Sequence, residues 1–213
     1  NIELSDSVIS YIIDNYTNES GIRKLKEKMY QIIREVNIKN LNNTIIYPYY
    51  IDNYFFNNIF KNNQKIIIKK IYPLPNIGIV NGLYATSHGL GGVTIIETFK
   101  MISETCLSLK LTGQQGDVMK ESMMCSQTLS WNIITNIIKN SIEKGWKTKK
   151  WGIHIHCPDT STPKDGPSAG AAITLAIISL LTKTPVINTI ALTGEIDLNG
   201  NITQIGGLDS KIE

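Results

Sequence analysis

Cysteine and histidine are scarce in this chain of 213 residues, and their scarcity limits the kinds of site that it can hold. The three cysteines, Cys106, Cys125 and Cys157, are odd in number and form no Cys-x-x-Cys pair, which argues against a disulfide framework or a zinc knuckle. No acidic pair completes a metal set with the histidines at a recognisable spacing, so we expect no metal site. The unpaired cysteines indicate a reducing or disulfide-poor compartment.

The chain also lacks a strong charge of either sign and any apolar run long enough to cross a membrane. Its formal net charge is only +3, and its densest basic stretch is KGWKTKKWG, from Lys144 to Gly152. We expect this stretch to be a solvated loop before a strand, with a contact surface as the alternative. The N-terminus carries no signal or transit pattern. The sequence therefore indicates neither a nucleic-acid partner nor a membrane.

The apolar pattern that is present first predicts a small helical unit over residues 1–61. Residues 6 to 41 read as two amphipathic helices, the first capped by Ser5 or Asp6. A short strand, TIIYPYY, and a third helix, DNYFFNNIF, complete the unit. Residues 62–77, with two prolines near their end, are predicted to be a linker.

The pattern changes at Gly78, where glycines and β-branched runs predict strands. We expect two strands joined by a turn, a third in LSLKLTG, a long amphipathic helix from Gly116 to Asn140 and a strand in WGIHIHCP. An apolar helix follows in AAITLAIISLLT, and strands are expected in NTIALTGEI and ITQIGGL. This mixed order indicates an α+β or α/β fold, of which we adopt α+β, for residues 78–213.

The stretch TPKDGPSAG, from Thr162 to Gly170, surrounds one serine with two prolines and two glycines. The apolar run behind it places a helix start at about Ser168, where unpaired backbone N–H groups and the positive end of the helix dipole converge. Such a site can hold an oxyanion of acyl transfer or a phosphate. Ser168 can equally be no more than the N-cap of a core helix.

A nucleophilic serine needs a base, and the residues leave two kinds open. The stretch is not Gly-x-Ser-x-Gly, which argues against an α/β-hydrolase elbow. His88 lies in a glycine-rich turn, while His154 and His156 face the same side of one predicted strand. The other candidate is Lys211 behind IGGL, because burial in an apolar site lowers the pKa of a lysine and frees its amine.

These motifs together resemble the proteolytic domain of Lon, the ATP-dependent protease: TPKDGPSAG, then ALTGEI, then IGGLDSK. The resemblance implies that Ser168 is the nucleophile and that Lys211 is its base, in a Ser-Lys dyad. It also implies that Thr193 of the TGE motif hydrogen-bonds the lysine amine, with Glu195 close behind. Asp165 matches the aspartate of the family.

The likeness extends over nearly the whole chain. GLYAT, IIET, LTGQQGDVMKES and IHIHCPDTSTPKDG follow the protease domain in order, and residues 6 to 36 resemble the helical lid of the family's ATPase module. Arg23 would then be the second sensor, which touches the nucleotide phosphate. Where the family usually has Ala-Trp, this chain has Tyr84 and Ala85, which leaves the peptide preference open. Where the family favours Lys-Glu, it has Asp209 and Ser210, and the lysine that follows them is retained.

The resemblance implies an ATP-dependent serine endopeptidase that degrades misfolded or regulatory proteins and assembles as a homo-hexamer. It also implies that the full-length enzyme uses ATP with Mg²⁺ and that the peptide-bond chemistry needs no cofactor. No GxxxxGK[ST] loop occurs, so we expect the chain to be a piece of a longer protein. The alternatives are a phosphate-binding domain like that of small-molecule kinases and a non-catalytic docking module. The resemblance favours the mitochondrial matrix, with the cytoplasm as the alternative.

Overall fold

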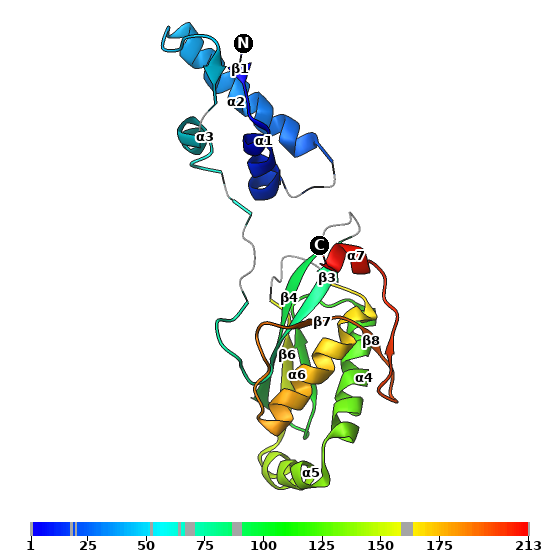
Figure 1. Cartoon of the computed structure of the whole chain (residues 1–213). Coiled ribbons are helices and arrows are strands. Elements are labelled where there is room, and N and C mark those ends of the chain that lie inside the picture. Colours follow the sequence, from blue (N-terminus) through cyan, green and yellow to red (C-terminus); the bar gives the residue numbers. More distant parts are fainter. Residues whose placement is uncertain are drawn as a thin grey trace. The chain divides into compact units, whose positions relative to one another are not determined.

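The computed structural model divides the chain into two compact units, Asn1–Ile68 and Lys69–Glu213 (Figure 1). It describes residues 2–17, 19, 21–51, 53–63, 65–66, 71–86, 91–158 and 164–212. Each unit has its own hydrophobic core, and each is described here by itself. None of the helices in these ranges combines the length and the apolar character needed to cross a bilayer.

In the residues that the structure describes, the first unit is built from three α-helices and a short pair of parallel strands. Its elements are β1 (Ile2–Glu3), α1 (Asp6–Ile12), the π-helical turn η1 (Ile13–Thr17), α2 (Arg23–Leu41), β2 (Tyr49–Tyr50) and α3 (Asn53–Ile59). Ser5 caps α1 by accepting a hydrogen bond from the backbone N–H of Val8, as one of the two predicted caps. The rings of Phe56 and Phe60 stack in the core of this unit, with their centroids 4.5 Å apart.

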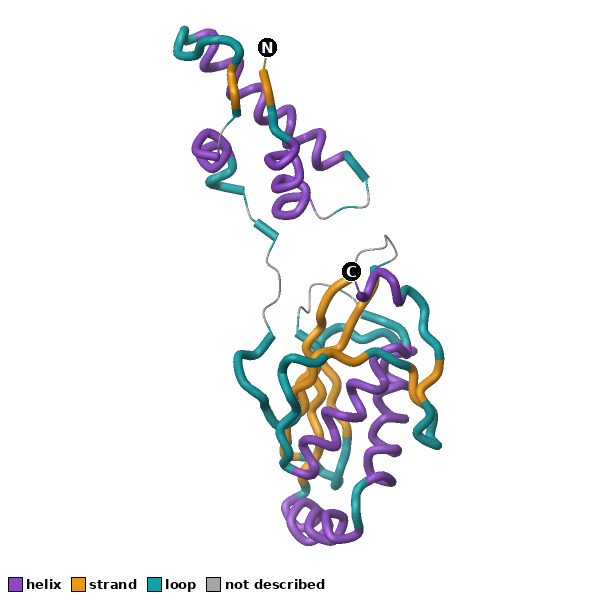
Figure 2. Tube along the Cα trace, viewed as in Figure 1, coloured by secondary structure: helices purple, strands orange, loops and turns teal. Residues whose placement is uncertain are grey.

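The second unit is a five-stranded mixed sheet with helices, and it confirms the α+β class. Its elements are β3 (Ile79–Ala85), β4 (Gly91–Ile102), β5 (Leu109–Thr112), α4 (Asp117–Ile133), α5 (Asn136–Ile142), the π-helical η2 (Glu143–Lys147), β6 (Trp151–His156), the 3₁₀ turn η3 (Pro167–Ala169), α6 (Gly170–Thr182), β7 (Ala191–Leu192), β8 (Glu195–Ile196), β9 (Ile202–Thr203) and α7 (Leu208–Ile212). The strands order as β5-β6-β4-β3-β7, and β8 pairs with β9 separately. Figure 2 shows the strands gathered beside the helices.

Three expectations for this unit were wrong in detail. The predicted helix from Gly116 to Asn140 is two helices, because Ile134 turns to an extended conformation that buries its side chain in the core. The stretch KGWKTKKWG is not a simple solvated loop: Trp146 is buried, and the Lys100 ammonium lies 4.9 Å from its ring centroid.

The third difference lies in the C-terminal stretches. The expected strand in NTIALTGEI is split, because β7 pairs with β3 only at Ala191 and Leu192 and the chain then leaves the sheet. In ITQIGGL only Ile202–Thr203 are extended, since their partner strand β8 has just two residues. The chain therefore returns as a short helix, α7, and this helix carries Lys211.

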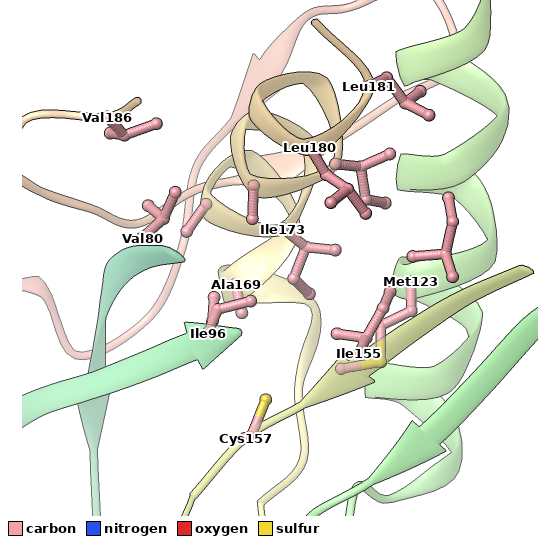
Figure 3. Packing of buried hydrophobic residues seen from close by; sticks show 14 of the residues in the cluster. Val80, Ile96, Met123, Ile155, Cys157, Ala169, Ile173, Leu180, Leu181 and Val186 are labelled. Carbon is pink, nitrogen blue, oxygen red and sulfur yellow. The ribbon is translucent and has the colours of Figure 1, made fainter. Parts of the chain in front are cut away.

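Helix α6 is the central element of the second unit. It is apolar around its whole circumference and lies between the sheet and α4. Figure 3 shows Ile173 and Leu180 of α6 pointing toward Met123 of α4 and Ile155 of β6. Close packing on every side fixes the position of α6, and with it the residues at its N-terminal end.

We predict that Ile173→Ala lowers the free energy of unfolding of this unit by about 2–4 kcal/mol, because the side chain is fully buried and leaves a cavity. Ile137→Ala is the matched control, since Ile137 is also helical but 82% exposed; its effect should stay within about 0.5 kcal/mol. Urea unfolding followed by tryptophan fluorescence gives both values. Equal effects of the two substitutions would contradict the central place of α6.

Candidate active site

The turn that leads into α6 is shaped by Asp165, Gly166 and Pro167. Gly166 has φ +114° and ψ 155°, a conformation that residues with a side chain rarely adopt. Pro167 then opens η3, where its fixed φ suits the first helical position. The remaining part of the motif at Thr162 and Pro163 lies outside the described residues. The turn thus places Ser168 in the first turn ahead of α6.

Asp165 connects this turn to the start of a second helix. Its Oδ1 accepts hydrogen bonds from the backbone N–H groups of Met119, at 3.0 Å, and Gly166, at 2.9 Å. Met119 is in the first turn of α4, so the carboxylate caps that helix from another segment. A side chain at Gly116 would collide with this carboxylate. Asp165 therefore fixes the serine turn against α4.

Ser168, Lys211 and Thr193 meet at one point. Lys211 Nζ lies 2.9 Å from Ser168 Oγ and 3.1 Å from Thr193 Oγ1. The Thr193 hydroxyl in turn donates to the Ser168 carbonyl oxygen, at 3.2 Å, and the N–H of Gly194 donates to the same oxygen at 2.7 Å. The segment between β7 and β8 is thereby fixed to the serine turn, and the three predicted residues form one hydrogen-bonded set.

Lys211 is held in place by the close approach of α7 to β4. A Cβ atom on Gly91 would lie 1.5 Å from the Ser210 carbonyl oxygen, so only glycine allows this contact. The Lys211 side chain is buried, and burial lowers the pKa of its amine below the ordinary value of 10.5. Within the described residues, no carboxylate is paired with it.

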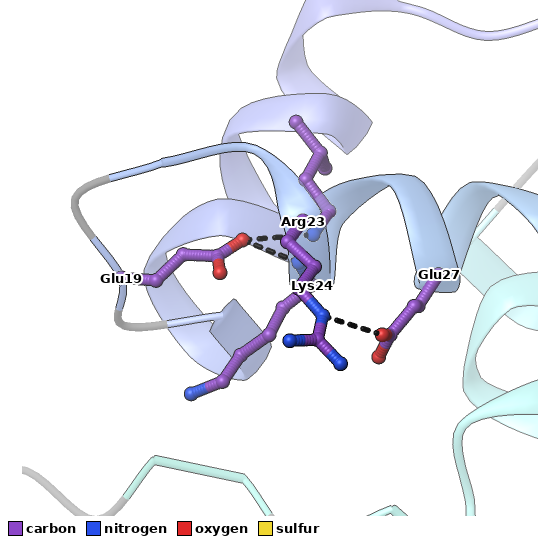
Figure 4. A network of polar contacts seen from close by, with 5 residues as sticks. Glu19, Arg23, Lys24 and Glu27 are labelled. Carbon is purple, nitrogen blue, oxygen red and sulfur yellow. Dashed lines mark hydrogen bonds and ion pairs between the residues drawn. The ribbon is translucent and has the colours of Figure 1, made fainter.

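Two of the other predicted site residues lie apart from the dyad. Glu195 is exposed on β8, at the edge of the pocket in front of Ser168. Arg23 begins α2 in the first unit, where its side chain is 89% exposed and its Nε lies 3.4 Å from Glu27 Oε1 (Figure 4). The carboxylate of Glu19 caps the same helix through the N–H groups of Lys24 and Leu25.

The two histidines of β6, His154 and His156, are engaged elsewhere. Thr112 Oγ1 lies 2.8 Å from His154 Nε2 and 2.7 Å from His156 Nδ1, so both rings share one hydroxyl on the sheet. Burial and the nearby Lys110 lower the pKa of His154. His88 lies outside the described residues. Lysine, and neither of these two histidines, is within hydrogen-bonding distance of Ser168.

A pocket of about 310 Å³ opens in front of Ser168, and we call it the serine pocket. It is lined by Leu83, Tyr84, Ala85, Thr94, Met119, Lys164, Asp165, Gly166, Pro167, Ser168, Ala169, Glu195, Gln204, Ile205, Gly206 and Lys211. Sequence reasoning missed Thr94 and Met119. Met119 stands in the LTGQQGDVMKES stretch, but nothing in that stretch marks it as a site residue, and both residues reach the pocket only through strand and helix packing. The sequence signal that could have drawn attention to Thr94 is the pair of nearby glycines, Gly82 opposite it in the ladder and Gly92 two residues before it.

Two family models identify the class of protein. Residues 53–213 match the model of the Lon protease (S16) C-terminal proteolytic domain, and residues 1–47 match the model of the Lon protease AAA+ ATPase lid domain. The chain is thus a proteolytic domain together with an ATPase lid. It belongs to the Lon protease family, and neither a kinase-like domain nor a non-catalytic docking module is supported.

Curated relatives agree over almost the full chain. The Lon protease homolog of Acanthamoeba polyphaga mimivirus is 33% identical over 97% of this chain, and the Lon protease of Methanosphaera stadtmanae is 38% identical over 99%. The Lon protease of Metamycoplasma arthritidis is 39% identical over 98%. The chain spans 26%, 24% and 24% of these three relatives, about a quarter of their length. With a virus, an archaeon and a bacterium as sources, these three relatives give no support to the mitochondrial matrix.

We predict that Asp165→Ala lowers the free energy of unfolding by about 1 kcal/mol, because the first turn of α4 loses its cap. Asp117→Ala is the control: Asp117 is acidic and in the same first turn, but its side chain is 99% exposed and caps no N–H of the described residues. Its removal should cost no more than a few tenths of a kcal/mol. Denaturant titration of both variants checks this, and a harmless Asp165→Ala would contradict the capping role.

Proposed function

We propose that Ser168 is the nucleophile and Lys211 the general base of a serine endopeptidase. The observation that supports this most is the placement of the Lys211 amine. It is buried, 2.9 Å from Ser168 Oγ, and unpaired with any carboxylate of the described residues. An amine in such surroundings loses its proton near the working pH far more readily than an exposed lysine.

Acylation follows from this arrangement. Neutral Lys211 removes the proton of the Ser168 hydroxyl as Oγ attacks the scissile carbonyl carbon. The negative charge that develops on the carbonyl oxygen is stabilised by backbone N–H groups near Ser168, at the start of the helical segment. The protonated lysine then donates its proton to the leaving amine. The products of this step are an ester on Ser168 and a free peptide amine.

Deacylation uses the same groups. The neutral Lys211 takes a proton from a water molecule, the resulting hydroxide attacks the ester, and Ser168 recovers its proton as the acid leaves.

Thr193 is a positioning residue in this scheme. Its hydroxyl accepts from the lysine amine and donates to the Ser168 carbonyl, so it holds the base at a fixed distance from the nucleophile. Asp165 supports the serine turn, and Glu195 borders the pocket.

For the full-length protein we propose an ATP-dependent enzyme, with Mg²⁺ and with Arg23 as the residue of the lid that senses the nucleotide phosphate. The match of residues 1–47 to an AAA+ lid supports the use of ATP. We further propose that it acts on unfolded or regulatory proteins as a homo-hexamer, in the cytoplasm. For the boundaries we propose 1–61 as lid, 62–77 as linker and 78–213 as protease domain.

The first test is the pH dependence of peptide hydrolysis by the chain. Only the neutral amine acts as a base, so the rate should rise with pH and level off above an apparent pKa that lies below 10.5. Lys211→Arg keeps the positive charge but cannot lose its proton, and it should reduce the rate at least about 100-fold. Lys110→Arg, an exposed lysine on β5, is the matched control and should change nothing.

Labelling by a fluorophosphonate, which reacts with activated serines, completes this test. The adduct should form on Ser168, should be lost in Ser168→Ala, and should require Lys211. Retained labelling and hydrolysis in Lys211→Arg would refute the dyad.

Thr193→Val should lower kcat about tenfold with little change in KM, because the amine loses one hydrogen-bond partner that orients it. Thr193→Ser keeps the hydroxyl and should retain most of the activity. Steady-state kinetics on one fluorogenic peptide compares the three proteins. If serine failed to restore the rate, the threonine would matter only for packing.

A further inference from the structure

A buried serine of α4 contacts the turn that carries the proposed nucleophile. Ser122 is 8% exposed, and its hydroxyl donates to the carbonyl oxygen of Pro167, at 3.4 Å. The two segments approach closely because Gly170 has no side chain: a Cβ atom there would lie 3.0 Å from Ser122 Oγ and 2.9 Å from a methyl carbon of Ile196. Burying a hydroxyl costs free energy that alanine would not cost, so this hydroxyl calls for an explanation.

The carbonyl that Ser122 contacts belongs to the peptide unit that ends in the N–H group of Ser168. A trans peptide unit is planar, so its C=O and its N–H point in opposite directions and rotate together. The same carbonyl also accepts from the N–H of Gly170, which closes the 3₁₀ turn η3. Two donors, one from the turn and one from α4, thus fix this peptide plane and the direction of the Ser168 N–H.

The 3₁₀ turn itself makes no use of the Ser168 N–H. Hydrogen bonds of such a turn join an N–H to the carbonyl three residues earlier, so the first N–H bonded within η3 is that of Ala169. Pro167 has no N–H, which leaves that of Ser168 as the first donor of the helical segment. A donor at this place, beside the nucleophilic oxygen, can stabilise the oxyanion of acyl transfer.

We propose that Ser122 is a positioning residue for the oxyanion of peptide hydrolysis: it holds the Pro167 carbonyl so that the Ser168 N–H points at the oxygen of the scissile carbonyl. This rests on the proposed peptidase function and adds a residue of α4 to it. Ser122 transfers no proton and touches no reacting atom. It acts only through the peptide unit between Pro167 and Ser168.

The effect of Ser122 is largest in the transition state. Its hydroxyl donates to the Pro167 carbonyl, and the N–H of the same peptide unit donates to the oxyanion, so the groups form a chain of hydrogen bonds. Hydrogen bonds in a chain polarise one another, and the long contact of 3.4 Å strengthens as negative charge develops on the substrate. An interaction that strengthens only then raises kcat and leaves KM nearly unchanged.

The next serine along α4 is a matched control. Ser126 is fully buried one helical turn further on, and its hydroxyl donates to the carbonyl oxygen of Gly170, at 3.2 Å. That peptide unit ends in the N–H of Ala171, which already donates to the carbonyl oxygen of Gly194. Ser→Ala removes one hydroxyl and one hydrogen bond between α4 and the same segment at both positions. A loss of stability is therefore shared, while an effect on the oxyanion belongs to Ser122 alone.

Two further variants test the hydroxyl of Ser122 itself. Ser122 and Pro167 line a second pocket, of about 250 Å³, so the added methyl group of a threonine has room there. Ser122→Thr keeps the donor and should retain most of the activity. Ser122→Cys keeps nearly the same shape but offers only a weak S–H donor, so it should lower kcat without unfolding the protein.

The experiment measures steady-state hydrolysis of one fluorogenic peptide by the full chain, with the active sites counted by fluorophosphonate labelling. We expect Ser122→Ala to lower kcat about tenfold at nearly constant KM, Ser122→Cys about threefold, and Ser126→Ala less than about twofold. The apparent pKa of the pH–rate profile should stay in place in Ser122→Ala, because Lys211 is unaltered. A peptide aldehyde, whose adduct with Ser168 has the oxyanion, should bind Ser122→Ala about tenfold more weakly.

The outcomes separate this inference from the peptidase function. If the original protein is labelled and cleaves the peptide but Ser122→Ala and Ser122→Cys keep its kcat, Ser122 does not position the N–H. An equal loss in Ser126→Ala, a shifted apparent pKa in Ser122→Ala, or no recovery in Ser122→Thr would show a general effect of packing and would also overturn the assignment. If neither labelling nor cleavage occurs in the original protein, the peptidase function itself fails. Where Ser122→Ala loses its fold, an unchanged kcat in Ser122→Cys is the contrary result.

Discussion

The contact between the Lys211 amine and the Ser168 hydroxyl is the one on which the rest of the site depends. The two residues are 43 positions apart, and each is held by separate packing. Ser168 is fixed because α6 is buried against the sheet and α4, and because Asp165 ties its turn to α4. Lys211 is fixed because Gly91 lets α7 approach β4 closely. Thr193 then links the amine to the serine carbonyl, so that a shift of either helix separates the pair.

This contact carries costs that the core has to offset. A buried amine without a carboxylate partner is less stable charged than it would be in water. Gly166 adopts a backbone conformation that is open to glycine alone in practice, and Thr94 has an unsatisfied hydroxyl. All three lie around one pocket, although a second buried hydroxyl without a partner, that of Thr174, lies in α6. Local departures of this kind concentrate where a protein acts on a ligand, because they are retained for function and not for stability.

The sequence predicted most helices, but it failed where strands needed partners and where the helix expected from Gly116 to Asn140 breaks at Ile134. The helix α2 and the strand β6 follow from apolar periodicity, and α6 follows from its continuous apolar run. The split of NTIALTGEI into β7 and β8 depends on where β3 offers a free edge, which no local pattern shows. The burial of Trp146 within a lysine-rich stretch was likewise decided by the core beneath it. Thr94 went unnoticed for the same reason, since its burial depends on Gly82 across the ladder.

By itself the sequence determined the family, the α+β class and the residue types of the site, because the motifs around Ser168, Thr193 and Lys211 are specific and stand in a fixed order. Only the tertiary structure decided that these three side chains touch, that Asp165 acts as a helix cap and that His154 and His156 are bound to Thr112. The physical reason is that the hydrogen bonds and the pKa of a buried amine depend on burial by segments remote in sequence. A pattern along the chain carries the identity of these groups but not their surroundings.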